Sequence, residues 1–189
     1  RSAVIGTNGT RIVGEDVASK LTTPEAPDLH ALFAVMRERQ VDTCAMEVSS
    51  HALVLGRVDG VVFDVATFLN LGRDHLDFHH DLDDYFAAKA SLFTPERARQ
   101  GLVNLDDEHG RLLLARASIA MSTYGITTPS EWMATEIEFG PQSSTFVVVT
   151  PGHRFNTDNR CTARLEPFFA ASFLLQPAAL QSWFVACYR

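Results

Sequence analysis

The chain alternates between short apolar runs and longer segments whose apolar residues recur every three to four positions. Runs rich in β-branched and aromatic residues predict buried strands, the last two of them paired. These strands are expected at residues 41–46, 61–69, 101–105, 131–139 and 145–150. The helical period predicts helices at residues 24–39, 81–93 and 108–117. Strands that alternate with helices indicate an α/β fold, with a mostly parallel sheet flanked by helices.

Signals at the helix ends support these assignments. The first helix has Pro24 and Glu25 in its first turn, as helix starts commonly do. The second has Asp81, Asp83 and Asp84 near its positive N-terminal end, where acids are favourable. Both helices therefore have sequence-encoded beginnings.

Composition narrows the class of protein. The 189 residues suffice for one sizeable core, and 46% hydrophobic with 21% charged residues is ordinary for a soluble fold. A net charge of −7 argues against nucleic acid as a partner but leaves a nucleotide possible. The three cysteines form no CxxC pair, which favours a reducing cytoplasm. We expect no membrane span and no signal peptide, since no run of about 18 apolar residues and no leader occurs.

The two ends differ from the rest. The chain opens at Arg1 without an initiator methionine and reads as a cut through a longer protein. From Arg160 onward it is rich in Phe, Leu and Ala without a helical period. We therefore expect a partial domain at residues 1–159 and a divergent tail at residues 160–189, for which a changed reading frame is one hypothesis.

Polar residues gather where two predicted strands end. Glu47 closes the strand at 41–46, and residues 70–75 follow the strand at 61–69. In open α/β sheets, ligands bind outside the carboxyl ends of the strands, so both clusters face one crevice. Lys89, on the following helix, can lean toward it.

Taken singly, these residues leave alternatives open. Glu47 suits magnesium but also a solvated surface position. His75 lies near Asp77, His79 and His80, which resembles a zinc or manganese cluster, yet one loop without a second cluster is a poor zinc site. We therefore place His79 and His80 on a surface loop. By default Lys89 is a surface residue whose stem covers apolar neighbours.

Thr22 and Thr23 precede the first helix, and they too have two interpretations. They could offer hydroxyl donors to an anion, beside the free amides of the helix end. By default they are plain helix caps, since Thr-Pro-Glu is a good helix start.

Three motifs together resemble the central, ATP-binding domain of the Mur ligases. They are Glu47-Val48-Ser49-Ser50-His51-Ala52-Leu53, Asn70-Leu71-Gly72-Arg73-Asp74-His75-Leu76-Asp77 and Tyr85-Phe86-Ala87-Ala88-Lys89-Ala90. The resemblance extends from about Gly6 to about Asn159. Within the family it is greatest to the E-type enzymes, which add the third peptide residue to a UDP-N-acetylmuramoyl dipeptide.

The resemblance implies an ATP-dependent amide ligase of peptidoglycan synthesis that forms an acyl phosphate. Magnesium would be held by the catalytic set Glu47, His75 and carbamylated Lys89. Carbamylation requires a neutral amine, which burial favours. The implied nucleotide contacts are Asn70, Asp74 and Asn156. The implied contacts to the UDP-muramoyl dipeptide are Thr22, Thr23, Ser49 and Arg57. The incoming amino acid is expected to be diaminopimelate rather than lysine.

The sequence also departs from the family pattern. A Gly-x-x-Gly-Lys-Thr phosphate loop should precede these motifs, and no GK[ST] occurs in the chain. The segment 151–159 has one residue more than the family segment that ends the central sheet, and the expected helix does not follow it. We therefore predict that the 189 residues alone are inactive.

Other interpretations remain beside a fragment of an E-type ligase. One is a non-catalytic relic or binding module that keeps the UDP-muramoyl dipeptide contacts. A folylpolyglutamate synthase is disfavoured by Thr22-Thr23-Pro24 and by the motif that starts at Glu47. A metal-dependent hydrolase is the most distant alternative.

Overall fold

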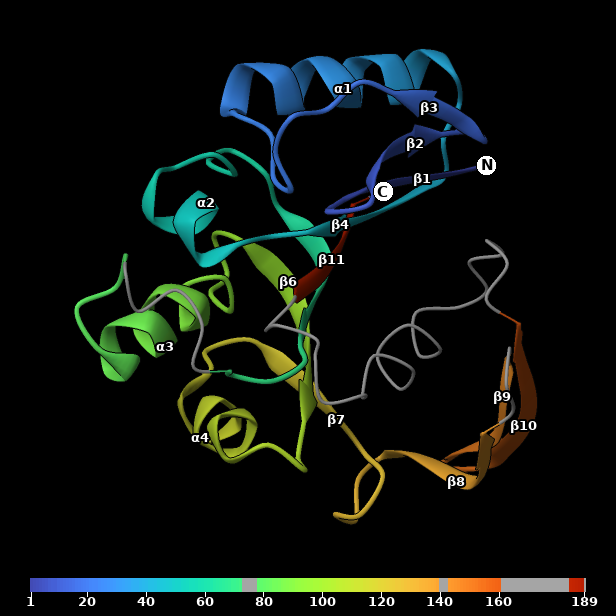
Figure 1. Cartoon of the computed structure of the whole chain (residues 1–189). Helices are drawn as coiled ribbons and strands as arrows, with labels where there is room; N and C mark the ends of the chain where they lie inside the picture. The colour runs from blue at the N-terminus through green and yellow to red at the C-terminus, as the bar shows by residue number, and fades with distance from the viewer. Residues whose placement is uncertain (73–77, 140–142, 161–183, 189) are drawn as a thin grey trace.

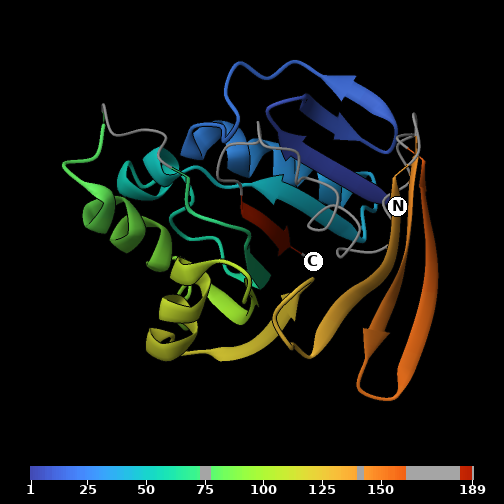
Figure 2. The ribbon, with the colours of Figure 1, turned by 60° about the horizontal axis from the view of Figure 1, so that its bottom comes forward.

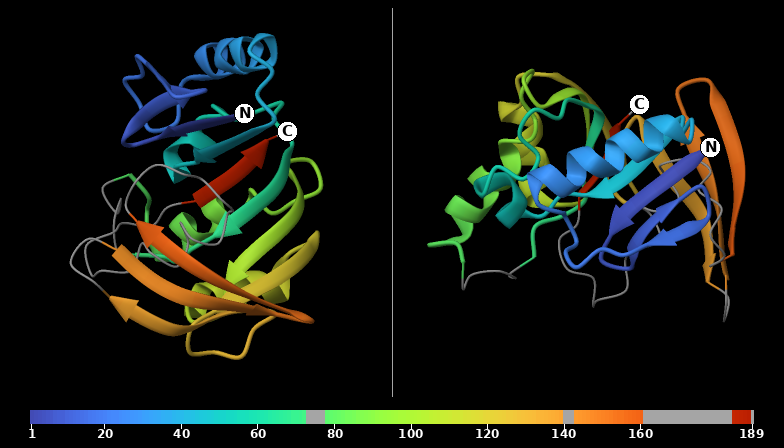
Figure 3. Two further views of the ribbon diagram at one scale, coloured as in Figure 1. Left: turned by 90° about the vertical axis from the view of Figure 1, so that its right-hand side faces the viewer. Right: turned by 90° about the horizontal axis from the view of Figure 1, so that it is seen from above.

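The structure is a computed structural model that describes residues 1–72, 78–139, 143–160 and 184–188. Its strands form one twisted sheet in the order β10-β9-β8-β7-β6-β5-β11-β4-β1-β2-β3 (Figure 3). The strands are β1 (Ser2–Gly6), β2 (Gly9–Ile12), β3 (Glu15–Val17), β4 (Thr43–Glu47), β5 (Phe63–Phe68), β6 (Ala98–Asn104), β7 (Ala120–Gly125), β8 (Trp132–Phe139), β9 (Ser143–Thr150), β10 (His153–Arg160) and β11 (Phe184–Tyr188). The helices are α1 (Ala26–Glu38), α2 (Ser50–Val54), α3 (Leu82–Ala90) and α4 (Glu108–Arg116).

The sheet is mixed: two parallel groups of strands are joined by the antiparallel β11, and both edges are antiparallel. β1 pairs with β4, and β5, β6, β7 and β8 pair in succession, all in parallel. Antiparallel ribbons extend the sheet at both ends, through β2 and β3 on one side and β9 and β10 on the other. The ribbon β8–β10 curves along one edge of the molecule (Figure 2). The predicted α/β class is confirmed.

Helices cover the sheet in two groups. α1 lies over β1 and β4, while α2, α3 and α4 gather beside the ends of β4, β5 and β6 (Figure 1). Apolar residues of α1, including the buried Leu29 and Met36, join the core built on β1, β4 and β5. α4 packs closely on β6, since a Cβ on Gly110 would lie 1.9 Å from the Asn104 carbonyl oxygen.

The predicted elements agree with the structure to within a few residues. α1 starts at Ala26 because Glu25 is extended and serves as its N-cap. α3 starts after Asp81, whose carboxylate accepts a hydrogen bond from the Asp84 amide at 2.8 Å, and it ends at Ala90 rather than at Phe93. The predicted pairing of 131–139 with 145–150 is confirmed as β8 and β9. The sequence patterns do not predict β1–β3, β7, β10, β11 or the five-residue α2, because these elements are short or polar.

β11 occupies the position between β4 and β5 and runs antiparallel to both. Val185 lies opposite Glu47 on one side and Thr67 on the other. No other described strand links the two halves of the sheet. β11, which lies in the predicted tail, is therefore part of the same sheet as the strands of residues 1–159. No helix among the described residues is long and apolar enough to cross a bilayer.

Candidate functional site

Glu47, the last residue of β4, points its carboxylate toward the turn after β1. Its Oε2 atom accepts hydrogen bonds from the Thr7 amide at 2.9 Å and from the Thr7 hydroxyl at 2.7 Å. Burial raises the pKa of the Glu47 carboxyl, and the two Thr7 bonds offset part of that shift. A Cβ on Gly6 would lie 2.8 Å from the carboxyl carbon, so glycine leaves room for the acid.

Thr23 connects the segment before α1 to the end of β4. Its side chain is buried, and its hydroxyl donates to the Glu47 carbonyl at 2.9 Å and accepts from the Ser49 amide at 3.1 Å. Thr22 lies beside it, with its hydroxyl 3.2 Å from that of Thr7. The interpretation of Thr23 as a helix cap is wrong, because the cap is Glu25 and the hydroxyl bonds across to β4 and Ser49.

Arg57, in the turn after α2, faces the same segment. Its Nη1 donates to the Thr23 carbonyl at 3.3 Å, and its Nη2 pairs with the Glu25 carboxylate at 2.8 Å. The side chain is 15% exposed, and its Nε is buried without a hydrogen-bond partner. Ser49 caps α2 by accepting from the Ala52 amide at 3.2 Å. The four predicted dipeptide contacts thus lie together, adjoining Glu47.

Lys89 lies on α3 and is 1% exposed, so its default placement on the surface is wrong. Its Nζ lies 5.0 Å from the centroid of the Tyr85 ring, one helical turn earlier. Burial of an amine favours its neutral form, which carbamylation requires. This placement is consistent with the predicted modification and does not test it.

The predicted nucleotide contacts fall in different places. Asn70 follows β5 and is half-buried. The end of that strand is fixed by Asn104, whose amide donates to the Leu69 carbonyl at 3.0 Å. Asn156 is exposed on the edge strand β10, separated from β11 by β5–β9. Asp74 and His75 lie outside the described residues.

His79 contradicts its predicted surface position. It is 3% exposed, its Nε2 lies 2.9 Å from the Ser50 hydroxyl, and its Nδ1 lies 3.3 Å from the Asp84 carboxylate. The reason is tertiary: α2 and α3 close over the loop that carries it. His80 is exposed as predicted, with 92% of its side chain accessible. No local pattern distinguishes the two histidines.

The donor chemistry fits magnesium better than a softer metal. Carboxylate oxygen is the ligand that magnesium prefers, and a cation at Glu47 would offset the cost of its burial. Among the described residues no group of three His, Cys, Asp or Glu side chains could hold a metal. The predicted magnesium set adds His75 and a carbamylated Lys89 to Glu47, and it stays a prediction.

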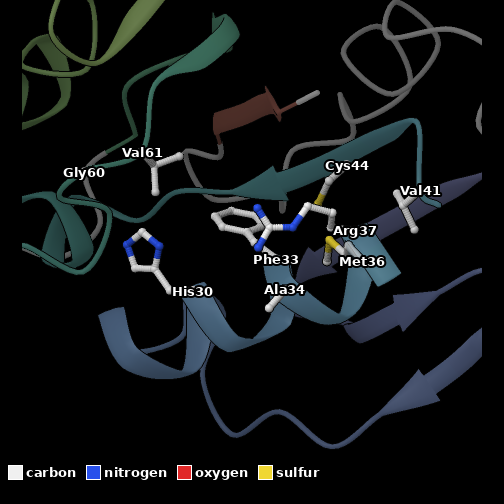
Figure 4. A pocket seen from close by; sticks show the side chains of 9 residues that line it. All are labelled: His30, Phe33, Ala34, Met36, Arg37, Val41, Cys44, Gly60 and Val61. Carbon is white, nitrogen blue, oxygen red and sulfur yellow. The ribbon is translucent and has the colours of Figure 1, made fainter. Parts of the chain in front are cut away.

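A cavity of about 360 Å³ lies elsewhere, between α1 and β4 (Figure 4). Its lining includes His30, Phe33 and Arg37 of α1 and Cys44 of β4. Burial raises the pKa of the Cys44 thiol to about 12, so this cysteine is not a nucleophile at neutral pH. The cavity is lined by none of the candidate site residues.

Comparison with known proteins identifies relatives along most of the chain. The Mur ligase middle domain matches residues 1–165. A UDP-N-acetylmuramoyl-L-alanyl-D-glutamate–2,6-diaminopimelate ligase of Streptomyces avermitilis is 51% identical over 95% of this chain and 35% of its own length. The enzyme of the same name from Streptomyces coelicolor is 55% identical over 79% of this chain and 30% of its own length.

A solved structure agrees with the same assignment. A UDP-N-acetylmuramoyl-L-alanyl-D-glutamate–2,6-diaminopimelate ligase superposes with a TM-score of 0.72 at 29% identity, covering 82% of this chain and 33% of the other. The chain thus spans about a third of the length of the relatives it matches.

Proposed function

The chain belongs to the Mur ligase family by its middle domain, and we propose that it is part of an ATP-dependent ligase that adds 2,6-diaminopimelate to UDP-N-acetylmuramoyl-L-alanyl-D-glutamate. The relatives' names supply this substrate and this amino acid. Since ATP is the phosphoryl donor, we place the reaction in the cytoplasm.

One observation carries the proposal. The Thr23 hydroxyl joins the Glu47 carbonyl to the Ser49 amide, and Arg57 donates to the Thr23 carbonyl. The proposed metal ligand and the proposed dipeptide contacts thus share one hydrogen-bond network. A substrate carboxylate held by Arg57 would lie beside the metal held by Glu47, as phosphoryl transfer to that carboxylate requires.

The reaction has two steps. A carboxylate oxygen of the dipeptide attacks the γ-phosphorus of ATP, the bond to ADP breaks, and an acyl phosphate forms. The amine of the incoming amino acid then attacks the acyl carbon, phosphate leaves, and the amine loses a proton. A bound magnesium ion would neutralise phosphate charge in the first step. The protein's task is to position the two reactants.

We assign the residues as follows. Thr22, Thr23, Ser49 and Arg57 hold the UDP-muramoyl dipeptide. Glu47, with His75 and carbamylated Lys89, holds magnesium. Asn70, Asp74 and Asn156 contact the nucleotide. In the carbamate, the Lys89 nitrogen is bonded to the carbon of CO₂ after losing a proton to solvent, which gives an anionic oxygen ligand.

Calorimetric titration with UDP-N-acetylmuramoyl-L-alanyl-D-glutamate tests the substrate site. We expect Arg57→Lys to weaken binding about tenfold or more, because lysine cannot form the two-pronged contact of a guanidinium. Arg99→Lys is the matched control, since Arg99 is exposed on β6 and pairs with Asp64 outside the network. Equal binding by the Arg57 variant and the wild type would contradict the assignment.

A chimera tests the ligase assignment itself. We expect residues 1–159 of this chain, placed in the aligned segment of the Streptomyces avermitilis relative, to support amide formation that Lys89→Ala abolishes. The 189-residue chain alone is expected to release no more phosphate from ATP than its Lys89→Ala variant. The binding-module alternative would be favoured by two results together: the 189-residue chain binds the UDP dipeptide, and the chimera makes no amide.

A further inference from the structure

His79 joins two elements that carry candidate site residues. Its Nε2 contacts the hydroxyl of Ser50, the first residue of α2, and its Nδ1 contacts Asp84 in the first turn of α3. Ser50 follows the proposed dipeptide contact Ser49, and α3 carries Lys89. The imidazole therefore bridges the substrate side and the lysine side of the site.

The contact with Asp84 fixes the role of one ring nitrogen. A carboxylate can only accept, so the Nδ1 atom of His79 carries the hydrogen toward Asp84. In the neutral imidazole Nε2 is then an acceptor, and the Ser50 hydroxyl donates to it. The same Asp84 oxygen accepts the His80 amide at 3.2 Å, which fixes the carboxylate. Both ring nitrogens are satisfied within a buried side chain.

The ring also packs on the aromatic side chain next to Lys89. The ring centroids of His79 and Tyr85 are 4.9 Å apart with 30° between their planes, and Tyr85 is fully buried. The Lys89 Nζ lies 5.0 Å from that same tyrosine ring. Tyr85 and Lys89 are four residues apart on one face of α3. The position of the Lys89 nitrogen thus depends on the Tyr85 ring, which His79 supports.

The chain Asp84–His79–Ser50 also resembles the hydrogen-bond order of a nucleophilic triad. A nucleophile must reach its substrate, however, and Ser50 is only 2% exposed while His79 is 3% exposed. The hydroxyl is also engaged in a hydrogen bond with the ring. These contacts therefore hold elements in place and do not form a hydrolytic site.

We infer that His79 is a positioning residue for the Lys89 side chain: it fixes the Tyr85 ring and locks the first turn of α3 to the first turn of α2. The inference rests on the proposed function, in which Lys89 serves the metal. Loss of the imidazole loosens the packing around Lys89 and exposes its nitrogen to solvent and reagents.

Competitive acetylation measures this exposure without any ligand. The chain has two lysines, Lys89 and the exposed Lys20, so the Lys89:Lys20 labelling ratio by mass spectrometry has an internal reference. We expect limiting acetic anhydride to label wild-type Lys89 much more slowly than Lys20, because Lys89 is buried and Lys20 is exposed. In His79→Ala we expect this ratio to rise about tenfold, since a buried hydrogen-bonded group is lost and local opening increases.

Two further variants separate positioning from general destabilisation. Ser50→Ala removes one bond with little change of volume and should raise the ratio in the same direction. His80→Ala alters an exposed neighbour and should leave it unchanged. All chains are compared at equal folded fraction by circular dichroism. A ratio within twofold of wild type in both His79→Ala and Ser50→Ala overturns the inference.

A second measurement separates this inference from the proposed function. ¹³C-bicarbonate is added, and the carbamate at Lys89 is read by ¹³C NMR, with Lys89→Ala to assign the signal. We expect a wild-type signal that His79→Ala reduces and His79→Gln partly restores, because glutamine can still bond to Ser50. Absence of the wild-type signal would refute carbamylation of Lys89, while the labelling ratio would still decide the role of His79.

Discussion

The Thr23 hydroxyl lies between the Glu47 carbonyl, to which it donates, and the Ser49 amide, from which it accepts. One side chain thus fixes the end of β4, the start of α2 and the segment before α1. These three segments carry the proposed metal ligand and the proposed dipeptide contacts.

Replacing Thr23 should therefore disturb both stability and binding. In Thr23→Val the shape is retained, but the Ser49 amide loses its partner in a partly buried environment, at a cost of about 1–3 kcal/mol. Urea unfolding measures this change. Thr23→Ser keeps the hydroxyl and is the control; if it were destabilised as much as Thr23→Val, the hydrogen bonds would not be the cause.

Glu47 should oppose folding at neutral pH when no metal is bound. Burial raises the pKa of its carboxyl in the folded chain, so its contribution favours folding at low pH and is lost as pH rises through the folded pKa. We expect Glu47→Gln to increase the free energy of unfolding at pH 7 relative to wild type, with the gain shrinking as pH falls through the raised folded pKa and absent below the unfolded value of about 4.3.

The control for this variant is Glu38→Gln, an exposed acid at the end of α1, which should show no such pH-dependent gain. Magnesium provides a second readout, because a ligand that binds only the folded state stabilises it. Magnesium should raise the melting temperature of the wild type more than that of Glu47→Gln. If magnesium raised the melting temperature of Glu47→Gln more than that of the wild type, Glu47 would not be a ligand of the metal.

Asp106 anchors the turn after β7 and should have the opposite pH dependence. Burial would raise the pKa of its carboxyl, but bonds from the Ile126 and Thr128 amides and the Thr127 hydroxyl outweigh burial and lower the pKa to about 2. Since the unfolded pKa is about 3.9, this stabilisation is complete above that value and is lost as pH falls toward 2.

Asp106→Asn tests that anchor. Asparagine turns one acceptor into a donor that faces backbone amides, so we expect a loss of about 1–2 kcal/mol at pH 7, moderated by solvent screening. Denaturant unfolding between pH 2 and pH 7 should show that the difference in free energy of unfolding between Asp106→Asn and the wild type becomes smaller as the pH falls. A difference independent of pH would mean that the charge of Asp106 is not what stabilises the turn.

β11 should be required for the two halves of the sheet to act as one unit. Ala186 lies opposite Met46 of β4 and Ala66 of β5, and a proline there removes a ladder donor from the middle of the sheet. We expect Ala186→Pro to lower stability by about 1–3 kcal/mol and to speed amide hydrogen exchange in β4 and β5. Ala186→Val, which keeps the N–H, is the control; equal exchange in both variants would contradict the pairing.

The local pattern of the sequence was enough to predict the class of fold and most of the inner strands and the helices that cover them. β4, β5 and β6 are runs of apolar, β-rich residues, and α1, α3 and α4 have the helical period and end signals such as Asp81. These features are local, since a strand or helix is largely selected by residues within a few positions. The short β1–β3 ribbon and α2 have too few residues for a period to emerge.

The sequence by itself also nominated the residues of the candidate site, through the motifs around Glu47, Asn70 and Lys89 and through Arg57, and their roles stay predictions. The tertiary structure decided how they are held: Thr23 is a bridge to β4 rather than a cap, Lys89 is buried, and His79 lies inside while His80 faces solvent. The physical reason is that burial and hydrogen-bond partners come from elements distant in the chain. His79 meets Ser50 across 29 positions, and no pattern around either residue encodes that contact.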